Sequence, residues 1–181
     1  MFQKTIIFIM ILVAAIFQEA AMVNFFPALM VPDVLLVVVA LWTARIGFEK
    51  TWPRAILAGL MLDLIFFWPP GVNIISLVVV SYLVSFLAKR FLISQKGWKF
   101  IFLVILTVIS TIILHLIYYL VSTTLLLSEN YMKMGAESIF SIGIIYKIMA
   151  NLVILFVVYW PVKKVEDFLS MFNQSVISTK R

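Results

Sequence analysis

Two aspartates lie inside hydrophobic segments of this chain, where a charged side chain is costly. Asp33 follows Pro32 and precedes an apolar run over residues 34–44, and Asp63 lies within a second apolar stretch, 55–68. An ionised carboxylate in hydrocarbon costs several kcal/mol, so it persists where a partner, a cavity or a function holds it. These two segments are therefore where a binding or transport site is expected.

Each aspartate has a structural interpretation beside a functional one. Pro32 and Asp33 suit the first turn of a helix, because proline lacks an N–H and an acid complements the positive helix end. Asp33 is thus either a helix cap or a binding residue. Asp63 shares a helical face with Ala55 and Gly59, four residues apart. Small residues let another helix approach closely, so this spacing predicts that Asp63 lies at a helix–helix contact.

Lys147 is the predicted counter-charge for the buried acids. It shares a four-residue stripe with Gly143 and Asn151, and its depth in the last apolar segment matches those of Asp63 and Glu19. A pair between Lys147 and either acid would neutralise two buried charges. Such a pair would either fix the helix register or relay an ion or substrate.

The single histidine belongs to a polar stripe in the fifth apolar segment. The stripe has a four-residue spacing and comprises Thr107, Thr111, His115, Tyr119 and Thr123. A stripe of this kind faces other helices rather than lipid. His115 is predicted to form an interhelical hydrogen bond, with a proton relay or a ligand contact as the alternative. One histidine without cysteine makes a zinc site improbable, and we expect no metal or other cofactor.

Composition places these residues in an α-helical integral membrane protein. Of 181 residues, 65% are hydrophobic and 12% are charged, against about 25% charged in soluble domains. Barrel strands would alternate apolar and polar residues, whereas this chain has long apolar runs. The chain carries no nucleophile, zinc-protease or phosphate-loop motif, which predicts a non-enzymatic protein. Its basic residues lie beside apolar segments, which indicates membrane topology and not nucleic-acid binding.

Six apolar segments predict a bundle of six membrane-spanning helices. They comprise residues 5–23, 25–44, 54–68, 72–88, 100–127 and 139–160. The second and third are short and interrupted by Pro or Gly, so residues 25–33 are expected to enter the membrane as partly irregular backbone. Residues 1–160 form the predicted transmembrane domain. Residues 161–181 form an amphipathic tail that lies on the membrane or on a partner, with Val162 and Phe168 on the face opposite Glu166 and Asp167.

The basic residues predict that both termini are cytoplasmic. With the N-terminus inside, twelve of the fourteen Lys and Arg residues fall in cytoplasmic segments. They are Lys4, Arg45, Lys50, Arg54, Lys89, Arg90, Lys96, Lys99, Lys163, Lys164, Lys180 and Arg181. Such an excess on one side is what the positive-inside rule describes.

Three ordered motifs resemble those of the MreD family, the small membrane subunit of the bacterial rod-shape machinery. They are Pro32-Asp33-Val34-Leu35-Leu36, Gly59-Leu60-Met61-Leu62-Asp63-Leu64 and Pro70-Gly71-Val72-Asn73. Chain length and span count are also similar over essentially the whole chain. Where family members commonly have Pro-Leu-Gly, this chain has Pro69-Pro70-Gly71.

The resemblance implies a non-catalytic subunit of the cell-elongation complex in the bacterial cytoplasmic membrane. Its implied partners are MreC, MreB and the glycosyltransferase and transpeptidase that build peptidoglycan. The implied fold is similar to that of the substrate-binding subunits of energy-coupling-factor vitamin transporters. The family motifs mark Pro32, Asp33, Gly59, Asp63, Gly71 and Asn73 as site residues, and Glu19, His115, Lys147 and Asn151 complete the predicted polar site.

The alternative function is a solute-binding subunit of a vitamin-type transporter. Such subunits often dock their partner through alanines four residues apart on the first helix. The first segment here has Ala14, Ala15, Ala20 and Ala21, and no two of these are four apart. This favours the assembly subunit.

Overall fold

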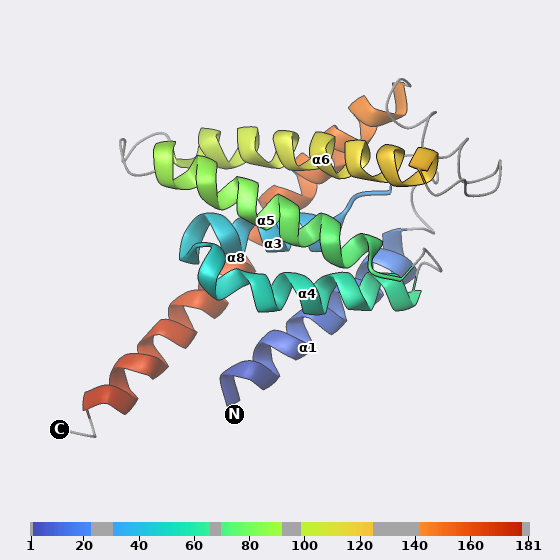
Figure 1. Cartoon of the computed structure of the whole chain (residues 1–181). Coiled ribbons are helices and arrows are strands. Elements are labelled where there is room, and N and C mark those ends of the chain that lie inside the picture. The colour runs from blue at the N-terminus through green and yellow to red at the C-terminus, as the bar shows by residue number, and fades with distance from the viewer. Residues whose placement is uncertain (1, 23–30, 66–69, 92–98, 125–141, 179–181) are drawn as a thin grey trace.

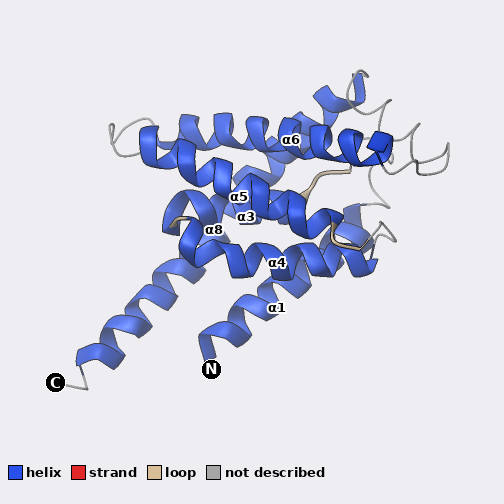
Figure 2. Cartoon of the chain, in the orientation of Figure 1, coloured by secondary structure: helices blue, strands red, loops and turns tan. Residues whose placement is uncertain are grey.

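The computed structural model describes residues 2–22, 31–65, 70–91, 99–124 and 142–178. These ranges contain helices and no strand (Figure 2), which confirms the predicted all-helical class. The helices are α1 (Phe2–Ile16), its π-helical continuation η1 (Phe17–Met22), α3 (Val34–Ile46), α4 (Phe48–Ile65), α5 (Val72–Phe91), α6 (Lys99–Thr124) and α8 (Ile142–Ser178). They form one bundle in which α4, α5 and α6 run nearly alongside one another (Figure 1).

Three of the described helices are long and apolar enough to cross a membrane. These spans are Val72–Arg90, Phe100–Val121 and Gly143–Phe168, and they confirm the last three predicted segments by length and composition. Thr5–Ala20 and Val34–Ile46 are shorter apolar helices. Of the predicted irregular entry, residues 25–30 lie outside the described chain, and residues 31–33 are non-helical.

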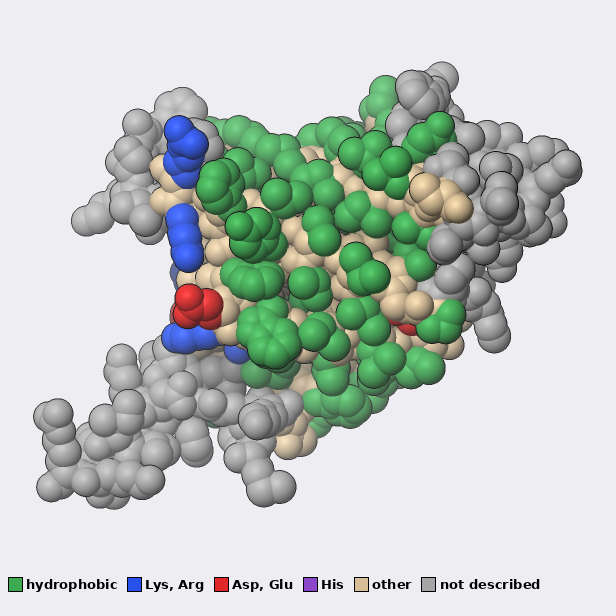
Figure 3. Space-filling view, viewed as in Figure 1, with side chains coloured by type: hydrophobic (Ala, Val, Ile, Leu, Met, Phe, Trp, Pro, Cys, Tyr) green, Lys and Arg blue, Asp and Glu red, His purple; other side chains and the backbone are tan. Residues whose placement is uncertain are grey.

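The outer surface of the bundle is apolar. On α5, the exposed side chains Ile75, Val79, Tyr82 and Phe86 recur every three or four residues and so share one helical face. Figure 3 shows such hydrophobic side chains covering the face in view, with Lys and Arg side chains gathered at one edge. An apolar band beside a charged edge is what a lipid-embedded bundle requires.

The short helix α3 forms the centre of the bundle. Every residue from Val34 to Thr43 is buried, and α3 contacts α1, α4, α5, α6 and α8. A helix that is apolar on all sides is stable only when other helices cover all of it. Gly47 ends α3 with a left-handed φ of 82°, and its N–H donates to the Thr43 carbonyl at 3.0 Å. Glycine adopts a positive φ of this kind without strain.

Helices α4 and α5 pack closely where Gly59 meets the first turn of α5. A Cβ atom added at Gly59 would lie 2.4 Å from Ile74 Cα and 2.6 Å from Ile74 N. Ala55 and Asp63 are buried on the same face of α4. The structure therefore confirms the predicted helix–helix contact along this small-residue face.

We expect Gly59→Ala to lower the free energy of unfolding by about 1–3 kcal/mol, because the added methyl group overpacks the contact. The obstructing atoms are backbone, so α5 must shift. This cost outweighs the roughly 1 kcal/mol that alanine gains in helix propensity. Denaturant unfolding in detergent measures the change. Leu60→Phe is the control, since Leu60 is 41% exposed; equal stability of Gly59→Ala and the parent chain would contradict the close packing.

Helix α8 continues past Pro161 and is held to the bundle by two ion pairs. Arg54 pairs with Glu166, and Arg45 Nη2 lies 2.9 Å from Asp167 Oδ1. The prediction that Glu166 faces away from the apolar side of the tail is wrong, because Glu166 is buried, as Val162 is, and pairs with Arg54 of α4. Phe168, assigned to the same face as Val162, is instead exposed. The ion pair with Arg54 determines which face of α8 is buried. Helical periodicity alone could not predict this pair.

Candidate polar site at the N-terminus of α3

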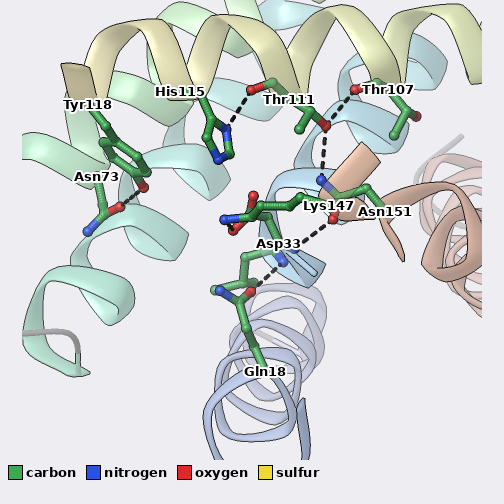
Figure 4. A network of polar contacts seen from close by, with 10 residues as sticks. Gln18, Asp33, Asn73, Thr107, Thr111, His115, Tyr118, Lys147 and Asn151 are labelled. Carbon is green, nitrogen blue, oxygen red and sulfur yellow. Dashed lines mark hydrogen bonds and ion pairs between the residues drawn. The ribbon is translucent and has the colours of Figure 1, made fainter. Parts of the chain in front are cut away.

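Asp33 and Lys147 form an ion pair inside the bundle. Lys147 Nζ lies 3.2 Å from Asp33 Oδ1, and the two side chains are 17% and 14% exposed respectively. The predicted pairing of Lys147 with Asp63 or Glu19 is therefore wrong. The reason is lateral packing: α8 contacts α3 directly, so the lysine reaches the residue that precedes α3 (Figure 4).

Side chains from two other helices bind the first N–H groups of α3. The Asp33 N–H donates to Asn151 Oδ1 at 2.7 Å, and the Leu35 N–H donates to Gln18 Oε1 at 3.1 Å. The Asp33 side chain makes no capping bond. Asp33 thus occupies the predicted N-cap position, but its carboxylate is directed to Lys147 and not to the helix N–H groups. Because the first N–H groups of a helix have no intrahelical acceptor, a buried helix start requires such outside partners.

Asn151 also connects this helix start to α6. Its Nδ2 donates to Thr111 Oγ1 at 2.9 Å, and the Thr111 hydroxyl donates to the Thr107 carbonyl at 2.9 Å. Thr107, Thr111 and His115 are all buried. The prediction that this part of the polar stripe faces other helices is confirmed.

His115 bonds within its own helix. Its Nδ1 lies 2.9 Å from the Thr111 carbonyl, where an interhelical hydrogen bond was predicted. The carbonyl four residues earlier is within reach of an imidazole on the same helix face, which accounts for the difference. The ring points from α6 toward the Asp33–Lys147 pair (Figure 4).

Asp63 organises a second polar group at the N-terminus of α5. Its Oδ2 accepts from the Gly71 N–H at 2.8 Å, and its Oδ1 accepts from the Asn73 N–H at 3.0 Å and from Asn73 Nδ2 at 2.9 Å. Gly71 has a left-handed φ of 97°, which glycine adopts without strain. The carboxylate thus lies at the positive end of α5, and that helix start stabilises its charge.

The family of the chain follows from its sequence. The family described as rod shape-determining protein MreD matches residues 1–165. The chain belongs to the MreD family. It is therefore a non-catalytic, multi-pass protein of the bacterial inner membrane with a role in rod-shape determination. Neither the curated proteins nor the solved structures contain a match to the chain.

In this MreD chain, Gln18 and Tyr118 join the polar groups without having been predicted. The Tyr118 hydroxyl donates to Asn73 Oδ1 and so connects α5 with α6. Tyr118 lies three residues after His115. Residues three apart lie on the same helix face, as residues four apart do. The four-residue spacing of the predicted stripe includes Tyr119 and passes over Tyr118. Gln18 directly precedes the predicted site residue Glu19. Its polar amide within an apolar segment could have marked it as a site residue.

Two carboxylate oxygens of this MreD chain are buried and, within the described residues, make no hydrogen bond. They are Glu19 Oε2 and Asp33 Oδ2. Buried polar atoms are nearly always satisfied, so each is a place where a donor from outside would be stabilised. Pro32 is buried immediately beside this point. The site can therefore accept hydrogen bonds, whereas Gly59 and Gly71 act through the backbone.

Proposed function

We propose that this MreD chain is a scaffold subunit of the cell-elongation complex that binds MreC and helps to organise peptidoglycan synthesis. The observation that carries the proposal is that the buried charges are engaged within the bundle. Lys147 neutralises Asp33, and the start of α5 holds Asp63. Interactions of this kind fix α3, α4, α5 and α8 relative to one another, which suits a rigid surface for a partner.

The proposed orientation has both termini in the cytoplasm. The excess of Lys and Arg in the segments assigned to the inside supports it. In Figure 1, α1 begins and α8 ends on the same side of the bundle, as this orientation requires. Residues 161–181 would then extend on the cytoplasmic side, where MreB acts, and the glycosyltransferase and transpeptidase would act outside. We also propose a fold similar to that of energy-coupling-factor substrate-binding subunits.

We place the MreC contact at the rim formed by the starts of α3 and α5. Pro70 in the turn before α5 is exposed, and Val31 before α3 is partly exposed. Both lie within a few residues of the polar groups. The unpartnered oxygens Glu19 Oε2 and Asp33 Oδ2 would accept hydrogen bonds from a partner chain at this rim.

Photocrosslinking in a rod-shaped host tests the contact. A photoreactive residue at position 31 or 70 is expected to capture MreC. The same residue at Phe86, an exposed position near the C-terminus of α5, serves as the control and is expected to capture none. Depletion of the protein should give round cells and release MreC from the complex. Normal rods with MreC still co-purifying would contradict the proposal.

A solute-binding transporter subunit is the second candidate function. The observation in its favour is the same pair of buried, unpartnered carboxylate oxygens, which could receive the donors of a small ligand. Native mass spectrometry of the purified chain distinguishes the two. A vitamin or nucleoside retained at one copy per chain would favour transport, and the scaffold proposal expects none.

A further inference from the structure

An open cavity of about 530 Å³ lies at the end of α3 opposite to the polar site. The end of α3, the C-terminal part of α5, α6 and α8 all contribute to its walls. The residues that matter for its chemistry are Arg45, Ala88, Lys89, Leu103, Tyr159 and Lys163. Its volume falls in the range of small-molecule sites.

The cavity carries an excess of positive charge. Arg45 is paired with Asp167, at 2.9 Å. Lys89 and Lys163 are exposed, and neither makes an ion pair with any residue in the described ranges. The C-terminus of α3 adds a partial negative charge beside Arg45. Two lysine charges remain uncompensated, which favours an anionic ligand.

The rest of the wall is partly apolar. Ala88 and Leu103 are buried in it beside the polar residues Thr43 and Ser85. Phe86 and Phe156 are exposed on α5 and α8, two of the helices that line the cavity. Trp160 is also exposed, with Lys164 Nζ lying 3.7 Å from its ring centroid. Tryptophan with a neighbouring cation is typical of the membrane interface, where lipid phosphates lie. The cavity therefore combines cations, an apolar wall and a position at headgroup depth.

We propose that this cavity binds the phosphate of an anionic phospholipid, with Lys89 and Lys163 as the charged contacts and the apolar wall against the first acyl carbons. Basic pockets between transmembrane helices are suited to such headgroups. The assignment of this lipid to the cytoplasmic leaflet depends on the proposed orientation. The proposal that the lipid binds depends on neither the orientation nor the MreC contact. An acidic peptide would require a longer cationic surface and would gain nothing from the apolar wall.

Native mass spectrometry of the full chain in detergent tests the proposal. Phosphatidylglycerol is expected to bind about thirtyfold more tightly than phosphatidylcholine, given the attraction of roughly 1 kcal/mol for each of the two lysines near an anionic headgroup. Glycerol 3-phosphate at equal concentration should not displace it. Lys89→Gln with Lys163→Gln should weaken phosphatidylglycerol binding about tenfold or more. The matched control, Lys50→Gln with Arg90→Gln, removes two exposed charges outside the cavity and should change binding less than about twofold.

Several results would overturn the proposal. Equal weakening by both double variants would indicate surface charge alone, and equal affinity for phosphatidylcholine would indicate apolar binding alone. Displacement by glycerol 3-phosphate would indicate a free-phosphate site, and preferential binding of polyglutamate would indicate a peptide site. Thermal unfolding checks that both double variants fold, and Lys89→Gln alone replaces the cavity variant if it does not. Because MreC is absent from the assay, these outcomes leave the scaffold proposal untouched.

Discussion

Lys147→Met is expected to lower the free energy of unfolding by about 3–5 kcal/mol, since it leaves Asp33 as an uncompensated charge inside the bundle. Methionine keeps the length and the apolar stem of lysine, so the loss reports the charge and not a cavity. Denaturant unfolding in detergent gives the value. Lys163→Met on the same helix removes an exposed lysine and should change stability by less than about 0.5 kcal/mol.

Combining Asp33→Asn with Lys147→Met tests whether the two charges interact directly. A buried ion pair can often be replaced as a whole at little cost, whereas removal of one partner is severe. The double variant Asp33→Asn with Lys147→Met should therefore be more stable than Lys147→Met alone. Strictly additive losses would contradict a direct interaction between the two charges.

Cell shape then separates the two roles that the sequence left open for Lys147. If the pair only fixes how α8 packs on α3, the double variant should restore rods along with stability. If the charges relay an ion or contact a partner, stability would return without restoring rods. Microscopy of a depleted host that expresses each variant at equal level makes this comparison.

The features predicted correctly are those determined by local sequence. The four-residue spacing of Thr107, Thr111 and His115 predicts that this part of α6 faces other helices, and all three residues are buried. The four-residue repeat of Ala55, Gly59 and Asp63 determines which face of α4 accepts α5. Both follow from helical periodicity, which needs no knowledge of neighbours.

The partners of the buried charges were beyond such reasoning. Sequence position gives the depth of a residue in the membrane, but it does not say which helices lie next to each other. Depth therefore made Asp63 and Glu19 the candidates for Lys147, whereas the packing of α8 on α3 selects Asp33. The start of α5 was a further omission. The free N–H groups at the start of α5 can stabilise a carboxylate without any basic residue, and Asp63 uses them.

This bonding pattern makes Asp63 the second site at which a large effect is expected. Asp63→Ala leaves three donors without an acceptor, namely the N–H groups of Gly71 and Asn73 and the Asn73 amide. Each buried unsatisfied donor costs about 1–3 kcal/mol, so a loss of about 3–5 kcal/mol is expected where some donors regain water near the exposed turn. Denaturant unfolding in detergent measures it, with Leu64→Ala as the control on the exposed side of the same turn.

Asp63→Asn distinguishes hydrogen bonding from charge pairing at this position. Asparagine keeps one carbonyl oxygen, which can accept both bonds from Asn73 as Oδ1 does, and loses the bond from Gly71 because its amide group is itself a donor. A loss of about 1–2 kcal/mol is therefore expected, clearly smaller than that of Asp63→Ala. If a lysine were the true partner of Asp63, the neutral asparagine would be as damaging as alanine. Equal losses in the two variants would therefore indicate that Asp63, and not Asp33, is the ion-pair partner of Lys147.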